Sequence, residues 1–126
     1  MKQKNVSPHV QIYKFPITAI SSISTRLSGF YLTGCFIGFG ISKLSNYDIY
    51  KEYKLLNSYQ QKFINYSIIV PFNFHTISGI RHFIVDKYPI FLTNNKMAYS
   101  SYLLFSSTAI TSILVENYLD KYRLLL

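Results

Sequence analysis

Long apolar stretches separated by short polar connectors dominate the chain. Three of them reach the length of about 20 mostly apolar residues that a membrane helix needs, and they cover about residues 20–44, 63–85 and 97–115. The third contains no charged residue and offers only Ser, Thr and Tyr as polar groups. It therefore lacks the polar stripe that a helix of a soluble bundle presents to water. The pattern predicts an all-α membrane protein with three transmembrane helices.

The proline and tyrosine positions support this interpretation. Pro71 lies inside the second stretch, where it would cost a soluble helix about 3 kcal/mol. Neighbouring helices in a membrane can satisfy the carbonyl that it frees. The connector between the first two stretches carries several tyrosines among charged residues, and tyrosine favours the headgroup level of a bilayer. Their spacing is compatible with a short surface helix, although an aromatic belt explains them equally well.

Composition narrows the choice of protein class. The 126 residues suggest one domain, a membrane anchor over residues 1–126 with an N-terminal arm at 1–19. Only 14% of the residues are charged and 49% are hydrophobic, whereas soluble domains carry about 25% charged residues. The net charge of +8 suggests nucleic acid or anionic lipid as a partner, but the lysines lie between the apolar stretches and form no basic stripe. The bilayer is therefore the expected partner, and nucleic acid is not. Three short spans enclose little volume, which indicates a hetero-oligomeric helical bundle.

The second stretch holds ionisable residues at helical spacing. His75, Gly79, His82 and Asp86 follow at intervals of four, three and four, so they share one helix face. His75 lies deep in the stretch, and a neutral imidazole at depth can bind a metal or haem iron through one nitrogen. An interhelical hydrogen bond is an equally good explanation for His75. Gly79 is expected to leave room beside it for a flat ring or another helix.

The polar residues after His75 have simpler explanations. His82 is expected near the membrane edge as an interfacial histidine. Arg81 and Asp86 are expected to form an edge pair that reaches towards water. On spacing alone, neither the histidine nor the pair requires a ligand.

The first stretch opens with hydroxyl groups around an arginine. Ser22, Arg26 and Gly29 fall at spacings of four and three, and so lie roughly on one face. Hydroxyls beside a guanidinium make a site for an acidic or carbonyl-bearing ligand, although helix capping with a snorkelling arginine is a common alternative. Gly34 and Gly38 form a small-xxx-small pattern that predicts a packing face.

Three short motifs together resemble a known family. They are SPHVQIY at 7–13, SISTRLSG at 22–29 and HTISGIRHFIVD at 75–86. Together they resemble the cytochrome b subunit of succinate dehydrogenase, the larger membrane anchor of respiratory complex II. The resemblance covers most of the chain.

The resemblance implies a role for each polar residue of the two membrane motifs. His75 matches the axial haem b ligand, with the second axial histidine supplied by the smaller membrane anchor subunit. Ser22 and Arg26 match residues that line the ubiquinone site, and Arg26 also lies near the haem propionates. Asp86 matches a residue near the quinone pocket, and His82 one near the haem edge.

The resemblance also implies the function and the location. The chain would help a flavoprotein and an iron–sulfur subunit to pass electrons from succinate to ubiquinone, within the tricarboxylic acid cycle and electron transport. By itself it would have no dehydrogenase activity. Its N-terminal arm and second connector would face the iron–sulfur subunit from one side of the mitochondrial inner membrane, or of a bacterial plasma membrane.

One position departs from the family pattern and keeps alternatives open. Thr25 stands where the family usually has a histidine before the arginine, which removes a donor near a haem propionate. The threonine hydroxyl could replace part of it. A haem-free structural anchor or accessory subunit is therefore the main alternative. A quinol:fumarate reductase anchor, and a transporter subunit with His75 beside a water path, are two others.

Overall fold

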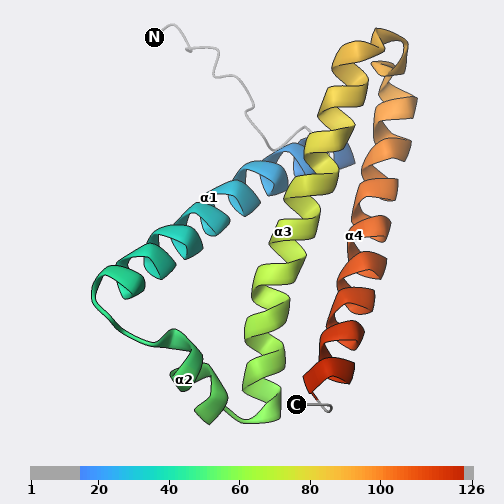
Figure 1. The fold of residues 1–126 in the computed structure, drawn as a ribbon. Coiled ribbons are helices and arrows are strands. Elements are labelled where there is room, and N and C mark those ends of the chain that lie inside the picture. Colours follow the sequence, from blue (N-terminus) through green and yellow to red (C-terminus); the bar gives the residue numbers. More distant parts are fainter. Residues whose placement is uncertain (1–14, 124–126) are drawn as a thin grey trace, which may run out of the picture.

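Helices account for most of the chain in the computed structural model, which describes residues 15–123 (Figure 1). The first motif of the family resemblance, at 7–13, therefore lies outside the described residues. The elements follow in the order α1 (Ile17–Leu44), α2 (Ile49–Leu55), α3 (Ser58–Lys87), the short 3-10 helix η2 (Pro89–Phe91) and α4 (Asn94–Arg123).

Polar residues cap two of the helices at their N-terminal ends. The second stretch, expected from about residue 63, begins at Ser58, since Asn57 and Gln60 form a capping box. The tyrosine-rich connector contains α2, so the surface-helix alternative is confirmed. Asp48 caps α2 by accepting hydrogen bonds from the backbone N–H groups of Tyr50 and Lys51.

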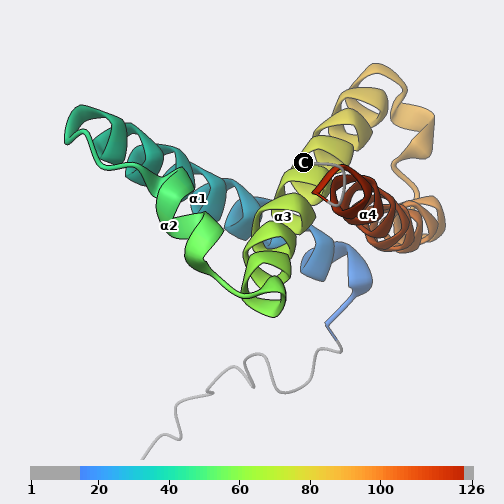
Figure 2. The same cartoon turned by 60° about the horizontal axis from the view of Figure 1, so that its bottom comes forward.

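Helices α3 and α4 lie side by side and antiparallel, while α1 crosses them with its first half only (Figures 1 and 2). The C-terminal half of α1 runs out to one side and connects through α2 to the start of α3. The beginning of α1, the end of α3 and the beginning of α4 thus meet in one region. This arrangement agrees with the prediction that the N-terminal arm and the second connector share one side.

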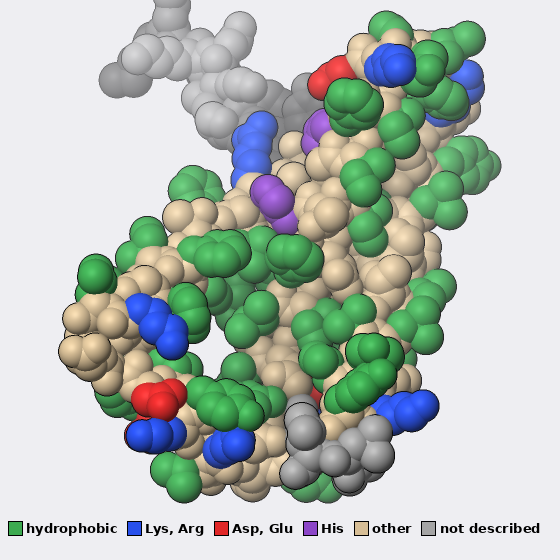
Figure 3. Space-filling model, viewed as in Figure 1, with side chains coloured by type: hydrophobic (Ala, Val, Ile, Leu, Met, Phe, Trp, Pro, Cys, Tyr) green, Lys and Arg blue, Asp and Glu red, His purple; other side chains and the backbone are tan. Residues whose placement is uncertain are grey.

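The distribution of side chains suits a lipid environment. Among the described residues the buried hydrophobic side chains are few, namely Leu32, Phe74, Val85 and Leu104. The buried polar ones are more numerous, namely Ser21, Ser28, Ser42, Ser78, Ser101, Thr108, Ser112 and Glu116. Large hydrophobic side chains are instead spread over the visible surface (Figure 3). Small hydroxyl residues between helices and apolar residues outside are typical of membrane helix packing.

Two of the three predicted spans are candidate membrane spans by length and composition. Within residues 15–123, α1 and the Asn94–Tyr122 part of α4 are long and apolar enough to cross a membrane. Helix α3 has 30 residues but does not reach the same mean hydropathy. Its polar side chains face neighbouring helices: Asn65 bonds Glu116 and Asn73 bonds Ser112. These polar side chains lower the mean hydropathy of α3, although they are part-buried between helices. A third membrane span therefore stays a prediction.

Arg81 is the main polar link among the three long helices. Its guanidinium donates hydrogen bonds to the hydroxyls of Ser21 on α1 (3.3 Å), Ser100 (3.0 Å) and Ser101 (3.1 Å) on α4. A further bond reaches the carbonyl of Met97 at 3.3 Å. The expected edge pair of Arg81 with Asp86 is therefore wrong, because the arginine turns inward towards hydroxyls while the aspartate stays exposed one and a half turns further on.

Arg81→Met should loosen the packing of α1 on α3 and α4. Membrane interhelical hydrogen bonds contribute about 0.6 kcal/mol each on average, so the loss of this cluster should cost about 2 kcal/mol. Thermal unfolding of the reconstituted protein measures the change. The control is Lys87→Met, which removes an exposed cation near the same end of α3. Equal stability of the two variants would show that the Arg81 hydrogen bonds contribute nothing.

Candidate functional site

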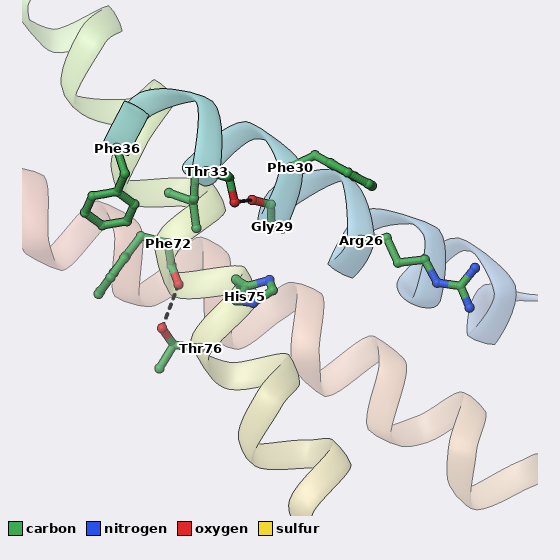
Figure 4. A pocket seen from close by; sticks show the side chains of 9 residues that line it. Arg26, Gly29, Phe30, Thr33, Phe36, Phe72, His75 and Thr76 are labelled. Atoms are coloured by element: carbon green, nitrogen blue, oxygen red, sulfur yellow. Dashed lines mark hydrogen bonds between the residues drawn. The ribbon is translucent and has the colours of Figure 1, made fainter. Parts of the chain in front are cut away.

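An open groove of about 590 Å³ lies where α1 crosses α3 (Figure 4). Ligand pockets usually measure roughly 300 to 1,000 Å³. Its lining combines aromatic rings with a few polar groups: Arg26, Gly29, Phe30, Leu32, Thr33, Phe36, Phe72, His75 and Thr76. Two sequence-predicted site residues from different stretches, Arg26 and His75, therefore meet in one place.

The His75 imidazole is oriented by α1. Its Nδ1 lies 3.1 Å from the backbone carbonyl of Thr25 and 3.2 Å from the hydroxyl of Ser28. That hydroxyl already donates to the Thr25 carbonyl at 2.8 Å, so both partners accept from Nδ1–H. The neutral ring then keeps its lone pair on Nε2, which makes no hydrogen bond with any described residue. Metal-binding histidines are commonly fixed in this way, through the nitrogen that does not bind the metal.

Gly29 on α1 also leaves room for the His75 ring. A Cβ atom on Gly29 would lie 3.0 Å from Cε1 of His75 and 3.4 Å from its Nδ1. A Cβ atom on Gly79 would meet nothing within 4 Å among the described residues, so room for a ring or a helix beside Gly79 stays a prediction. The role of Gly29 could not be predicted, because sequence spacing relates residues of one helix and cannot show which residue of another helix faces them.

Arg26 lies at one end of the groove, and Phe36 and Phe72 lie at the other. Figure 4 shows His75 between them, with Phe36 and Phe72 on one side and the Arg26 side chain extending away along α1 on the other. Arg26 is exposed, while Ser22 is half-buried one turn earlier on α1. A flat apolar group lying on the aromatic part would have a cation at one edge.

The remaining predicted site residues lie on the outer face of α3. His82 and Asp86 are exposed, as are His75 and Gly79 before them. The positions one residue earlier, from Phe74 to Val85, pack against α1 and α4 instead. The structure therefore supports one polar face through His75, His82 and Asp86, but shows no hydrogen bond between any two of these side chains.

The hydroxyl of Thr25 makes its hydrogen bonds within the protein. Its hydroxyl donates to the carbonyl of Ser21 at 2.8 Å and lies 2.6 Å from the hydroxyl of Ser78 on α3. A threonine has one O–H proton, and here that proton is already donated. Thr25 does not line the groove, so we do not expect it to replace the donor that the family's histidine would offer.

The residues that line the groove fit a haem for which this chain supplies one iron ligand. Within the described part of the chain no three His, Cys, Asp or Glu side chains form a cluster that could hold a metal ion. His75 would therefore contribute a single ligand to a metal whose other positions are filled from elsewhere. A macrocycle that contacts Phe36 and Phe72 and carries carboxylates towards Arg26 satisfies this requirement.

Ser28 and Gly29 contact His75 in the structure, and sequence analysis did not assign either of them to it. Gly29 had a signal, because it shares a face with Ser22 and Arg26. Ser28 had none, because its bond to His75 joins positions 47 apart in the chain.

Comparisons with known proteins identify the family of this chain. Residues 1–115 match the family described as the succinate dehydrogenase/fumarate reductase transmembrane subunit. The chain is 28% identical over 110 residues to the mitochondrial succinate dehydrogenase cytochrome b560 subunit of Dictyostelium discoideum, covering 84% of this chain and 57% of that protein. It is 30% identical over 90 residues to the corresponding subunit of Mus musculus, covering 64% of this chain and 52% of that protein.

The chain thus spans about half the length of the curated relatives that it matches. The family match, however, extends over most of its 126 residues and includes both motifs that meet at the groove. The predicted resemblance is confirmed: the chain belongs to the family of succinate dehydrogenase and fumarate reductase transmembrane subunits.

Proposed function

We propose that this chain is a membrane-anchor subunit of a succinate:ubiquinone oxidoreductase, complex II. It crosses the mitochondrial inner membrane with α1, α3 and α4, and it supplies one axial ligand of haem b and part of the ubiquinone site. The family membership and the mitochondrial relatives support this assignment. The observation that carries the haem ligand is the orientation of His75, whose Nδ1 is held by Thr25 and whose Nε2 is left with a lone pair.

A haem b bound at this face would supply a site for storing an electron. His75 would hold its iron from this chain, together with a histidine of the smaller anchor subunit. Arg26 and His82 would stabilise the propionate groups by charge and hydrogen bonding. α1 contacts one side of the His75 ring, but Gly79 and His82 on the same face are exposed, and Gly79 has open space beside it among the described residues. This exposure supports a partner helix on this face.

Ser22, Arg26 and Asp86 contribute to the quinone site. Reduction places negative charge on the carbonyl oxygens of a quinone, and the Ser22 hydroxyl and the Arg26 guanidinium stabilise that charge. Two protons must follow the electrons, so the site must lie near water. The exposed carboxylate of Asp86 in the last turns of α3 supports such a polar network.

The other subunits complete the enzyme. The flavoprotein oxidises succinate, and the iron–sulfur subunit carries electrons to the membrane side where α1 begins and α4 begins. Gly34 and Gly38 have open space beside them within the described residues, which suits close packing of a partner transmembrane helix.

A haem-free anchor is the second candidate, and Thr25 favours it. Its hydroxyl proton is donated to Ser21, so the groove has one donor fewer than the family pattern provides. In that case His75 would serve only to join α1 and α3 through Thr25 and Ser28.

Isolation of the chain from its native membranes tests the proposal. We expect flavoprotein and iron–sulfur subunits to co-purify, together with succinate:quinone reductase activity and a b-type band after dithionite reduction. A chain isolated without the two catalytic subunits would contradict the anchor function. An active complex without the b-type band would establish the haem-free alternative.

Gly29→Ala is expected to disturb the haem site while leaving the helices intact. The new methyl group would lie 3.0 Å from Cε1 of His75, so the ring must move by a few tenths of an ångström. We expect a shift in the position of the b-type band or in its midpoint potential, measured by redox titration. Gly40→Ala is the control, because it also lies on α1 and has open space beside it. Identical spectra of both variants would contradict the close approach.

A further inference from the structure

A second groove lies on the side of α3 opposite to His75. It measures about 330 Å³ and is formed by α3, η2 and α4. Its walls are mostly aliphatic and aromatic: Ile77, Ile80, Arg81, Ile84, Val85, Phe91, Lys96, Ser100, Leu103, Leu104 and Ser107. Since Ile77, Ile80 and Ile84 are about half a turn from the His75 face, this groove is separate from the proposed haem and quinone sites.

The groove contains two cations and no acidic side chain. Arg81 donates only to hydroxyls and a carbonyl. Lys96 donates to the carbonyl of Ile90 at 3.1 Å, and its ammonium lies 5.6 Å from the centre of the Phe91 ring. The ion pairs found within residues 15–123 join other residues, Lys51 with Asp48 and Lys62 with Asp120. Both cations of the groove therefore lack a carboxylate partner there.

The position of Lys96 gives a second reason to expect a bound anion in the groove. It lies in the first turn of α4, which begins at Asn94. The N-terminus of a helix carries partial positive charge, and its first N–H groups have no partner within the helix. A lysine there is electrostatically unfavourable, and a bound anion would relieve both the lysine and the helix end.

The depth of the two cations fits a lipid headgroup. Arg81 lies six residues before the end of α3 at Lys87, or about 9 Å along the helix. Its guanidinium bonds the carbonyl of Met97, next to Lys96, and so points to the first turn of α4. Further towards the middle of α3 and α4 the groove is apolar, with Ile80 and Leu103 exposed on its two sides.

We propose that this groove binds a membrane phospholipid with net negative charge. Its phosphate lies between Lys96 and Arg81, and an acyl chain follows the apolar wall between α3 and α4. A neutral lipid or quinone would fill the apolar part but leave both cations without a counter-charge, whereas basic pockets between membrane helices bind anionic headgroups. The inference does not depend on the proposed haem and quinone sites.

Photolabelling of the protein in the assembly in which it is isolated tests this site. The probes are diazirine-bearing phosphatidylglycerol and phosphatidylcholine in bilayers, and mass spectrometry quantifies labelling of the peptides that line the groove. We expect stronger labelling by phosphatidylglycerol. Lys96→Gln should reduce that preference about fivefold, because each basic side chain near a membrane surface contributes about 1 kcal/mol.

Matched variants separate this site from a general surface charge. Lys87→Gln removes a cation near the same end of α3 that does not line the groove, and we expect it to keep most of the preference. Arg81→Gln should also lower the preference, but it can loosen the helices, so Lys96→Gln is the decisive variant. Equal labelling by both lipids, equal losses in Lys87→Gln and Lys96→Gln, or displacement of the lipid by excess inorganic phosphate would overturn the proposal.

Discussion

Replacement of His75 by leucine is expected to remove the b-type absorption band from the isolated complex. His75 is the deep histidine of the described residues, and its Nε2 offers the only lone pair of an imidazole in the groove. Leucine has a similar size but no ligand atom. The loss to helix packing should be small, about 1 kcal/mol for the hydrogen bond to Thr25. The measurement is the difference spectrum of dithionite-reduced against oxidised complex, normalised to flavin or iron content.

His82→Leu is the matched control for this experiment. His82 lies on the same face of α3, two turns further on, and is proposed to contact the haem edge without binding iron. We expect the b-type band of the His82→Leu variant to keep most of its amplitude. An unchanged band in the His75 variant would refute the ligand assignment, and loss of assembly in both variants would show that the face binds a partner helix instead.

Arg26→Leu is expected to lower quinone reduction about a hundredfold, since removal of one preorganised donor to a developing oxyanion costs roughly 10²- to 10³-fold. Ser22→Ala should have a smaller effect of the same kind. Succinate oxidation with an artificial dye acceptor should stay nearly intact, because the proposal places the flavin and iron–sulfur centres in other subunits. Steady-state kinetics with a short-chain ubiquinone and with the dye provides the comparison.

Ser24→Ala controls for changes to the hydroxyl-rich start of α1. Ser24 lies two residues after Ser22 and lines a different cavity, beside Leu27 and Phe105. We expect normal quinone kinetics from this variant. If Arg26→Leu and Ser22→Ala also show normal quinone kinetics, the quinone site does not include this face of α1.

Much of the fold could be predicted from the apolar pattern. The three stretches at about 20–44, 63–85 and 97–115 correspond to α1, α3 and α4, and the structure extends each helix, α4 by eight residues at its C-terminal end. The extensions were missed because the residues added at the helix ends are largely polar, such as those that follow the Asn57 cap of α3. The number of spans was less well determined, since the polar residues of α3 lower its hydropathy although several of them bond α1 and α4.

The candidate site could be predicted only in part, because spacing along one helix does not show its contacts with other helices. Spacing placed His75, His82 and Asp86 on one face of a helix, and the structure agrees. Arg81 was expected beside Asp86, but it turns to Ser21 and Ser101 on the other helices. An arginine near the end of an apolar segment takes the acceptors that tertiary packing offers, and the sequence does not show where those acceptors lie.

The sequence by itself determined the helices, the membrane setting, the family and the residues able to bind a ligand, because these depend on periodicity, composition and local motifs. Only the tertiary structure decided how residues of different helices meet. The crossing of α1 over α3 brings Gly29 and the Thr25 carbonyl to His75, and the pairing of α3 with α4 places Arg81 and Lys96 in one groove. The crossing point and rotation of each helix depend on side-chain packing and hydrogen bonds between distant segments. These interactions are set by the whole bundle, so no single stretch of sequence determines them.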